Sequence, residues 1–340
     1  MITVLTFIKE RMRITLMPSR RTLFALGAAS LLLVSACAGT DADEESASGV
    51  DVMASFYPLE WVSQRVVGDR ADVSSLTPPG AEAHDLELSP RDVADMTEAD
   101  LVVYLSGFQP AVDDAVTIAE DTVAVDAAEL TSLDLTAADD GDDHSGEEKH
   151  SDEEHAEEGD EHSDEAGAVD PHFWLDPVRL AEVGDALADQ LAEVDPANAE
   201  LYARNAADLR ADLESLDEQM AAGLSDCEKP DLVTSHQAFG YLADRYGFTQ
   251  VGISGLSPED EPSPTELAEV TDFVRENDVD TIYFETLVSP DVAQIVADEA
   301  GATAVTLDPV EGLTEESAGD DYLEVMRSNL TTLQEGQSCM

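Results

Sequence analysis

Positively charged residues are scarce in this chain. Its 340 residues include 16 lysines and arginines against 76 aspartates and glutamates, which gives a formal net charge of −60 at pH 7. Lysine occurs only at Lys9, Lys149 and Lys229. A surface this acidic repels the phosphate backbone of DNA and RNA, so nucleic acid is excluded as a partner.

Long apolar runs are equally scarce, and the one that exists lies near the N-terminus. Leu23 to Ala36 is too short to span a bilayer and follows Arg20 and Arg21, as in the hydrophobic region of a secretory signal. The run ends in the letters VSAC, which resemble a bacterial lipobox whose cysteine, here Cys37, becomes lipidated. An ordinary signal peptide that contains a cysteine by chance is the alternative.

These features predict an exported lipoprotein. We expect residues 1–37 to form the signal peptide, with the general and the twin-arginine export routes both open, and residues 38–49 to form a tether. The lipid would hold the protein to the outer face of the cell membrane. No later stretch approaches membrane length, so we expect the rest of the chain to lie outside the bilayer.

Cysteine is scarce too. Beyond Cys37 only Cys227 and Cys339 remain. In an exported protein an isolated pair indicates a disulfide, which here would tie the C-terminus to the start of the second half. Two free buried thiols are the alternative.

Histidine is also rare, and all seven histidines fall into two groups. Three stand singly beside turn residues, far apart in the sequence: His84, His172 and His236. Four lie in one acidic run: His144, His150, His155 and His162. Imidazole is the preferred side-chain ligand for zinc and its neighbours, and carboxylates add charge and oxygen donors. The two groups indicate a metal-binding protein. The acidic run would form a segment that collects metal ions, and the three single histidines would come together in one folded metal site.

The collecting segment is residues 139–166. It has no apolar periodicity, so we expect a disordered insertion. Its histidines are unevenly spaced, which enforces no single geometry and predicts weak, exchangeable metal capture close to the main site. A solvated spacer with incidental histidines is the alternative.

Elsewhere the chain alternates strand and helix patterns. Short apolar strands between helices predict parallel sheets covered on both faces, and therefore an α/β fold. We expect an N-terminal lobe at 50–176, a helical linker with one long strut helix at 177–224, and a C-terminal lobe at 225–340. Ser89-Pro90 and the capping box at Ser263 mark two helix starts.

The single histidines and two acids follow predicted strands. His236, Glu285 and Asp308 come directly after strands of the second half, and ligands bind beyond the C-terminal ends of strands in open parallel sheets. His84 lies in the loop after a strand of the first half, and His172 just past the insertion. Three imidazoles and one carboxylate, meeting in the cleft between the lobes, would make a tetrahedral zinc set.

Four stretches carry a family resemblance: PPGAEAHDLELSPRDVADMTEADLVVYLSG, DPHFWLDP, TSHQAFGYLADRYG and TIYFETLVSPDVAQIVADEAGATAVTLDP. They resemble the signatures of family 9 metal-binding solute-binding proteins, the lipoprotein receptors of bacterial ABC importers for zinc and manganese. The resemblance extends from Val50 to the C-terminus and spares only the acidic insertion. It implies two α/β lobes joined by a rigid helix.

The resemblance also implies the ligands. The histidines that match the family's metal ligands are His84, His172 and His236. The fourth ligand varies among relatives, and here we favour Glu285, with Asp308, Glu82 or water as alternatives.

The resulting hypothesis is a monomeric zinc receptor that delivers Zn²⁺ to the permease of an ABC importer and performs no chemistry. A manganese receptor of the same family is the nearest alternative, but three nitrogen ligands favour zinc. A zinc-buffering or adhesive surface lipoprotein is a further alternative. A secreted zinc hydrolase is disfavoured because the chain has no H-E-x-x-H or comparable paired motif.

Overall fold

The computed structural model describes residues 49–119, 122–137 and 167–340. Four features expected from the sequence lie outside this part, the tether except for its last residue: the signal peptide, the lipidated cysteine, the tether at 38–49 and the acidic insertion. Their residues are Cys37, His144, His150, His155 and His162. Within the described residues, no helix combines the length and the apolar character that a membrane crossing requires.

The first half of the chain builds a parallel sheet in the order β2-β1-β3-β4. The two inner strands are almost wholly buried, whereas the outer strands are partly exposed, as expected for a sheet covered by helices. The strands are β1 (Asp51–Ala54), β2 (Asp72–Ser75), β3 (Leu101–Tyr104) and β4 (Val123–Asp126). We call this sheet with helices α1 to α3 the N-terminal lobe.

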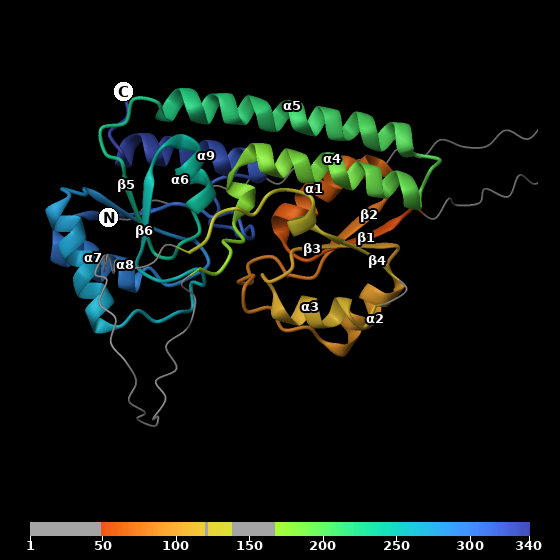
Figure 1. The fold of residues 1–340 in the computed structure, drawn as a ribbon, viewed down its shortest axis with the longest axis horizontal. Coiled ribbons are helices and arrows are strands. Elements are labelled where there is room, and N and C mark those ends of the chain that lie inside the picture. Colours follow the sequence, from red (N-terminus) through yellow and green to blue (C-terminus); the bar gives the residue numbers. More distant parts are fainter. Residues whose placement is uncertain (1–48, 120–121, 138–166) are drawn as a thin grey trace, which may run out of the picture. The chain divides into compact units, whose positions relative to one another are not determined.

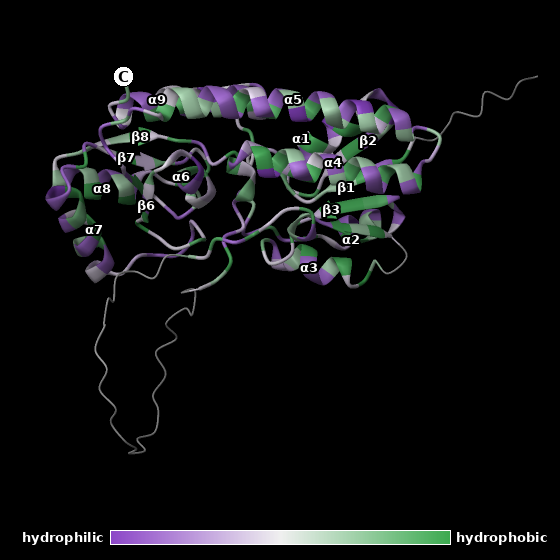
Figure 2. Ribbon diagram, turned by 45° about the horizontal axis from the view of Figure 1, so that its top comes forward, coloured by the Kyte–Doolittle hydropathy of each residue, from purple (hydrophilic) through white to green (hydrophobic). Residues whose placement is uncertain are grey.

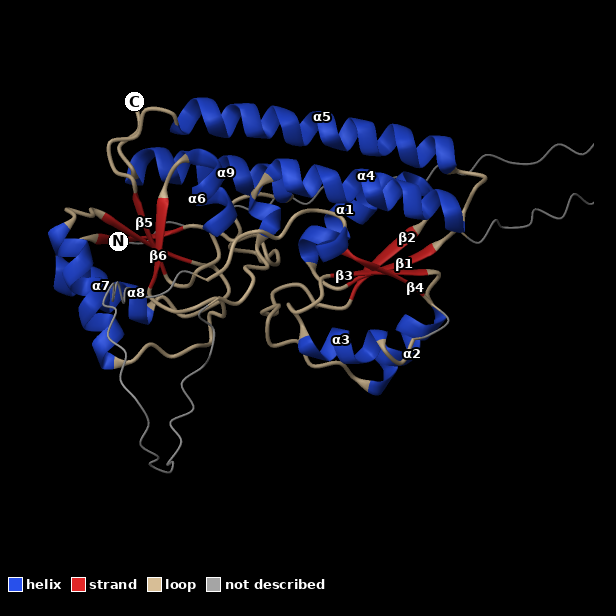
Figure 3. Ribbon diagram, in the orientation of Figure 1, coloured by secondary structure: helices blue, strands red, loops and turns tan. Residues whose placement is uncertain are grey.

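The second half repeats the pattern with the order β6-β5-β7-β8, again all parallel. We call this sheet with helices α6 to α8 the C-terminal lobe. The strands are β5 (Asp231–Thr234), β6 (Thr249–Gly252), β7 (Thr281–Phe284) and β8 (Thr303–Thr306). Figure 3 shows the two groups of strands, each flanked by helices. The predicted α/β class with two parallel-sheet lobes is confirmed.

Helices cover both sheets. The predicted starts of α2 and α7 are confirmed, because Ser89 and Ser263 each close a capping box with proline at the first helical position. The helices are α1 (Tyr57–Val67), α2 (Pro90–Glu98), α3 (Pro110–Val116), α4 (Pro177–Val194), α5 (Ala199–Leu224), α6 (Gly240–Tyr246), α7 (Pro264–Glu276), α8 (Asp291–Ala300) and α9 (Tyr322–Gly336). Short 3-10 turns occur at η1 (Gly68–Arg70), η2 (Ala127–Glu129) and η3 (Phe173–Leu175).

The longest helix, α5, links the lobes. Its 26 residues run alongside α4 and also pack against α1 of the N-terminal lobe and against α6 and α9 (Figure 1). Two ion pairs fix it at different points: Arg65 of α1 to Asp212 at 2.6 Å, and Arg245 of α6 to Asp217. Hydrophobic and hydrophilic residues alternate along its length, whereas β3 is uniformly hydrophobic (Figure 2). Its buried residues recur every three or four positions, so the helix has one buried face and one solvent face.

The two cysteines of the described part lie together. Cys227 follows α5, and Cys339 follows α9 near the C-terminus. Their sulfur atoms are joined as a disulfide in the structure, across a sequence separation of 112 residues. The C-terminal segment therefore lies beside the start of the C-terminal lobe.

Candidate metal centre

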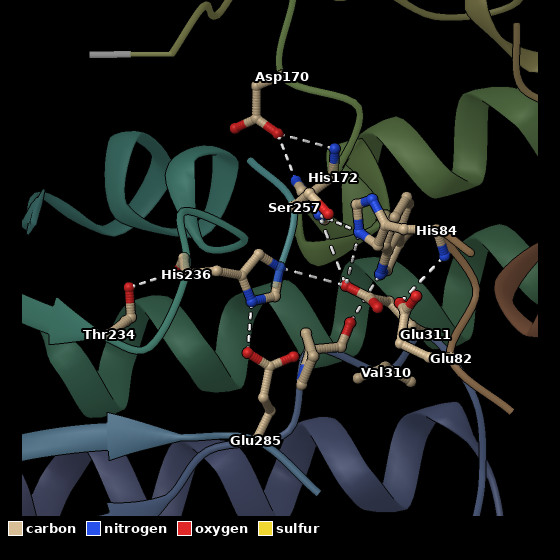
Figure 4. A network of polar contacts seen from close by, with 12 residues as sticks. Glu82, His84, Asp170, His172, Thr234, His236, Ser257, Glu285, Val310 and Glu311 are labelled. Atoms are coloured by element: carbon tan, nitrogen blue, oxygen red, sulfur yellow. Dashed lines mark hydrogen bonds and ion pairs between the residues drawn. The ribbon is translucent and has the colours of Figure 1, made fainter. Parts of the chain in front are cut away.

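Four side chains from distant parts of the chain converge on one point (Figure 4). They are His84, His172, His236 and Glu311, whose nearest ligand atoms all lie within 4.8 Å of one another. The Oε1 atom of Glu311 is 3.7, 3.5 and 3.6 Å from the Nε2 atoms of these three histidines, in chain order. The three histidines expected from the sequence therefore do meet.

The cluster is almost sealed from solvent. The side chains of His172 and His236 are 0% exposed and that of Glu311 is 1% exposed, whereas His84 keeps 11%. Among the described residues, neither carboxylate oxygen of Glu311 has a hydrogen-bond partner, nor has Nε2 of His236. Glu311 thus forms ion pairs with the imidazoles but no hydrogen bonds, which leaves its buried oxygens incompletely satisfied. A cation bound between these groups would supply the missing contacts.

The donor set fits zinc. Three imidazole nitrogens and one carboxylate oxygen match the four-coordinate, tetrahedral preference of Zn²⁺. A harder ion such as Mn²⁺ prefers a larger share of oxygen donors. All three imidazoles present Nε2, so the ring atoms that face the centre are equivalent.

His172 is fixed by an aspartate two residues earlier. Oδ1 of Asp170 accepts a hydrogen bond from the backbone N–H of His172 at 2.9 Å and lies 2.8 Å from its Nδ1. A proton held on Nδ1 by this carboxylate leaves the Nε2 lone pair free for a metal. The ring of Trp174 packs beside the imidazole, with ring centroids 5.2 Å apart.

Glu285, the fourth ligand favoured from the sequence, lies behind the cluster and is not among the four converging side chains. Its Oε1 pairs with Nδ1 of His236 and accepts a hydrogen bond from Ser235 Oγ at 2.7 Å. Strand β7 lies beside β5, so the residue after β7 reaches the far side of the imidazole that follows β5. We therefore replace Glu285 by Glu311 as the candidate fourth ligand.

Glu311 reaches the centre through a strained turn after β8. Val310 has φ of 61°, a left-handed conformation rare for a β-branched residue. Its N–H donates to Oδ1 of Asp308 at 2.8 Å, and Trp174 Nε1 donates to the carbonyl of Pro309 at 2.7 Å. Asp308, an alternative ligand from the sequence, instead uses its carboxylate to hold this turn. Burial raises the pKa of Asp308 to about 6.

His84 lies in the loop after β2. Glu82, the other alternative ligand, accepts hydrogen bonds from the N–H groups of His84 and Asp85, each at 3.0 Å. Its carboxylate therefore stabilises the backbone conformation of this loop. Glu82 is not part of the four-residue cluster. The ring of Phe108 packs against the imidazole of His84 with a centroid distance of 4.5 Å.

The charges of the cluster are strongly coupled. Burial opposes protonation of His236, but the nearby Glu285 and Glu311 carboxylates outweigh it and raise its pKa to about 10. The pKa of His172 is raised in the same way by Asp170 and Glu311. Burial also opposes ionisation of Glu311, but the three histidines lower its pKa well below the ordinary value. Without a metal, the buried carboxylate is therefore balanced by protons on the imidazoles.

Sequence reasoning missed Glu311, Asp170 and Phe108. An acid two residues before a candidate ligand histidine, as in Asp170-Pro171-His172, is a usable signal for an Nδ1 partner. Glu311 gives no comparable signal, because it lies five residues beyond the end of β8. Phe108 follows β3 in a loop and has no periodic pattern around it.

Comparison with known proteins adds an independent line of support. The family model for zinc-uptake complex component A, periplasmic, matches residues 52–336. The high-affinity zinc uptake system protein ZnuA of Bacillus subtilis is 36% identical over 322 residues, which cover 91% of this chain and 95% of that protein. The zinc-binding lipoprotein AdcA of Streptococcus pneumoniae is 37% identical over 315 residues, covering 90% of this chain but only 60% of AdcA. This chain thus spans less than two thirds of AdcA.

Solved structures agree in fold. The laminin-binding protein Lmb of Streptococcus agalactiae, described as bifunctional with adhesin and metal-transporting activity, gives a TM-score of 0.71 at 33% identity. That match covers 85% of this chain and 100% of Lmb. The Zn(II)-bound ZnuA-like domain of S. pneumoniae AdcA gives 0.67 at 33% identity, covering 85% of this chain and 99% of that domain.

Proposed function

Because the chain belongs to the zinc-uptake complex component A family, we propose that it is an extracytoplasmic, high-affinity zinc receptor that hands Zn²⁺ to the permease of an ABC importer. Zinc is its cargo. The proposed ligands are Nε2 of His84, His172 and His236 and the carboxylate of Glu311. The observation that carries the proposal is the fully buried Glu311 carboxylate, which faces three imidazoles and has no hydrogen-bond donor among the described residues.

Zinc is proposed over manganese because of the donor atoms. Three of the four converging ligand atoms are imidazole nitrogens, and the fourth is a carboxylate oxygen. Nitrogen ligands suit the borderline-soft zinc ion better than the oxygen-seeking manganese ion. The second imidazole nitrogens of His172 and His236 each pair with a carboxylate, an arrangement that increases ligand basicity.

The site supports binding rather than catalysis. A catalytic zinc keeps one coordination position open for water or substrate. Here four protein groups converge, and three of their side chains are 0 to 1% exposed. We therefore propose that the protein captures and releases its ion without chemistry.

We further propose that the exported chain is monomeric, that Cys37 carries the lipid anchor, and that Cys227 and Cys339 form their disulfide outside the cytoplasm. The acidic segment with His144, His150, His155 and His162 is proposed to collect zinc weakly near the main site. Intact-mass measurement before and after reduction tests the disulfide, and metabolic labelling with a fatty acid tests the lipid.

The test of function is zinc titration of untagged protein with and without residues 139–166. We expect the shortened protein to keep one tight zinc site per chain. Glu311→Gln should raise the zinc dissociation constant by more than about 100-fold, beyond the range typical of groups that only support a ligand. Glu315→Gln makes the same change at an exposed position of the same loop and should leave affinity unchanged. A shortened protein without a tight site would refute the proposal.

A further inference from the structure

We infer that two glutamines, Gln109 and Gln250, are positioning residues for the zinc ligands, one in each lobe. Each uses its side-chain amide to hold the backbone that presents one histidine. Neither hydrogen-bonds to an imidazole ring or to the Glu311 carboxylate: Gln109 reaches the carbonyl of Ala83, and Gln250 reaches the backbone carbonyl of His236. Their effect on the metal would therefore pass through the loop backbone. This inference rests on the proposed function, because it concerns the same site.

In the N-terminal lobe the amide of Gln109 holds the loop that carries His84. Its Nε2 donates to the carbonyl of Ala83 at 2.9 Å and to Thr77 Oγ1 at 3.0 Å. Thr77 in turn donates to the carbonyl of Ser55, just beyond β1, at 2.7 Å. The amide therefore links the start of the loop, at Thr77, to the residue before His84, and Thr77 links both to the C-terminal edge of the sheet.

Gln109 is well placed for this role. It is 1% exposed and directly follows Phe108, whose ring packs against the His84 imidazole. Of these two consecutive residues, Phe108 packs against the His84 ring and Gln109 hydrogen-bonds to the carbonyl of the residue before His84. His84 is the most exposed of the three histidines and has the most freedom to lose, so fixing its loop should matter for affinity.

The C-terminal lobe repeats the arrangement on a different framework. Gln250 lies in β6, and its Nε2 donates to Thr234 Oγ1 at 3.0 Å and to the carbonyl of His236 at 3.2 Å. Thr234 Oγ1 also donates to the His236 carbonyl, at 2.6 Å. In both lobes a glutamine amide therefore meets a threonine hydroxyl and the backbone carbonyl at or just before a ligand histidine.

The consequence is preorganisation. A metal site gains affinity when its ligands are held near their bound geometry before the ion arrives, because less freedom is lost on binding. Glutamine suits the task because one amide nitrogen offers two donors to two acceptors. Methionine has a similar length and shape but offers no donor. Gln→Met therefore removes the hydrogen bonds to the loop backbone with little change in side-chain volume.

The chain supplies a matched control. Gln337 is also 1% exposed, and its Nε2 donates to the carbonyls of Lys229 and Asp231 at 3.0 and 2.9 Å. These acceptors lie at the start of β5, opposite the end of the strand that leads to His236. Gln337→Met therefore removes an equally buried amide with these two hydrogen bonds, and also the one that the Tyr283 hydroxyl donates to its Oε1 at 3.1 Å, all far from the ligands.

The experiment compares full-length Gln109→Met, Gln250→Met and Gln337→Met with the unaltered chain. Zinc dissociation constants are measured by competition with a chelator, and melting temperatures are measured without zinc. All three variants should melt at lower temperature, but only Gln109→Met and Gln250→Met should bind zinc more weakly, by about tenfold each. If Gln109→Met does not fold, Gln109→Leu, which is also uncharged and offers no donor, provides a second variant.

Two results would overturn the inference: unchanged affinity in both site variants, or equal weakening in Gln337→Met. Either result, together with tight binding by the unaltered chain, leaves the proposed function standing. Absence of tight binding in the unaltered chain would overturn both.

Discussion

Asp170 lies so close to Gly240 that a side chain at this glycine would collide with it. A Cβ atom built on Gly240 would stand 2.3 Å from Oδ2 of Asp170. The other oxygen of the same carboxylate lies 2.8 Å from Nδ1 of His172. The start of α6 in the C-terminal lobe thereby limits where the carboxylate that pairs with Nδ1 of the proposed ligand His172 can be.

This contact predicts an effect on zinc from a residue outside the cluster. Gly240→Ala should push Asp170 away from His172 and weaken zinc binding by about tenfold, the lower end of the range for groups that support a ligand. Gly184→Ala is the control, because its Cβ would meet Leu209 Cδ2 at 2.7 Å inside the packed pair of α4 and α5. It should lower the melting temperature without changing zinc affinity. Equal affinities for both variants would contradict the role given to Asp170.

Substitutions of Glu285 can show whether it binds the metal directly or only supports His236 through Nδ1. Glu285→Gln keeps an oxygen that accepts from Nδ1 of His236, so zinc affinity should fall only a few-fold. Glu285→Ala leaves that nitrogen buried without its partner and should weaken binding by about 10- to 100-fold. Chelator competition measures both. Near-complete loss of binding in Glu285→Gln, as strong as in Glu311→Gln, would instead make Glu285 a direct ligand.

Zinc binding should release protons. Since the pKa of His236 in the cluster is raised to about 10, this residue carries a proton at neutral pH that the metal must displace. Calorimetry at pH 7.5 in buffers of different ionisation enthalpy should show release of at least about one proton per zinc. Affinity should therefore rise with pH. Binding without proton release would contradict the charge balance described for the cluster.

The same raised pKa sets how the stability of the metal-free protein depends on pH. The folded state holds a proton on His236 more tightly than the unfolded state, whose pKa is the ordinary 6.5. The stabilisation is fully present below pH 6.5 and is lost as the pH rises through about 10. Denaturant titrations of metal-free protein should show this contribution declining across that window, and His236→Gln should remove it.

The strut helix offers a test of stability away from zinc. Arg245 of α6 meets Asp217 of α5 through two contacts, at 2.5 and 2.7 Å, and the two side chains are 27% and 21% exposed. Arg245→Met should lower the free energy of unfolding by about 1.5–3 kcal/mol, the range for hydrogen bonds to charged groups. The more exposed pair of Arg65 and Asp212 is the control, and Arg65→Met should cost at most about 1 kcal/mol. Equal losses in urea titrations would contradict this difference.

Much of the fold was predictable from the sequence because its signals are local. Strands are short apolar runs, and Ser89 and Ser263 mark helix starts by their own hydrogen bonds. Two of the proposed ligand histidines were predictable for a similar reason: His236 lies two residues beyond the end of β5, and His84 lies in the loop after β2. Strand ends at one edge of a parallel sheet converge without further information.

The residue that supplies the proposed fourth ligand was not predictable in this way. Strand order places Glu285 beside His236, but it does not say on which side of the ring the carboxylate lies. Glu311 reaches the centre only because Val310 adopts a left-handed conformation and Trp174 holds the carbonyl of Pro309. Trp174 and Pro309 are 135 residues apart, so this turn depends on tertiary contacts that no local pattern encodes.

The most direct test of the central claim is a crystal structure of the zinc-loaded protein with anomalous data at the zinc absorption edge. We expect one strong peak within bonding distance, about 2.0–2.2 Å, of three histidine Nε2 atoms and a Glu311 oxygen. Glu285 should remain on Nδ1 of His236. A peak bonded to Glu285 in place of Glu311, or a main peak away from the three histidines, would contradict the account.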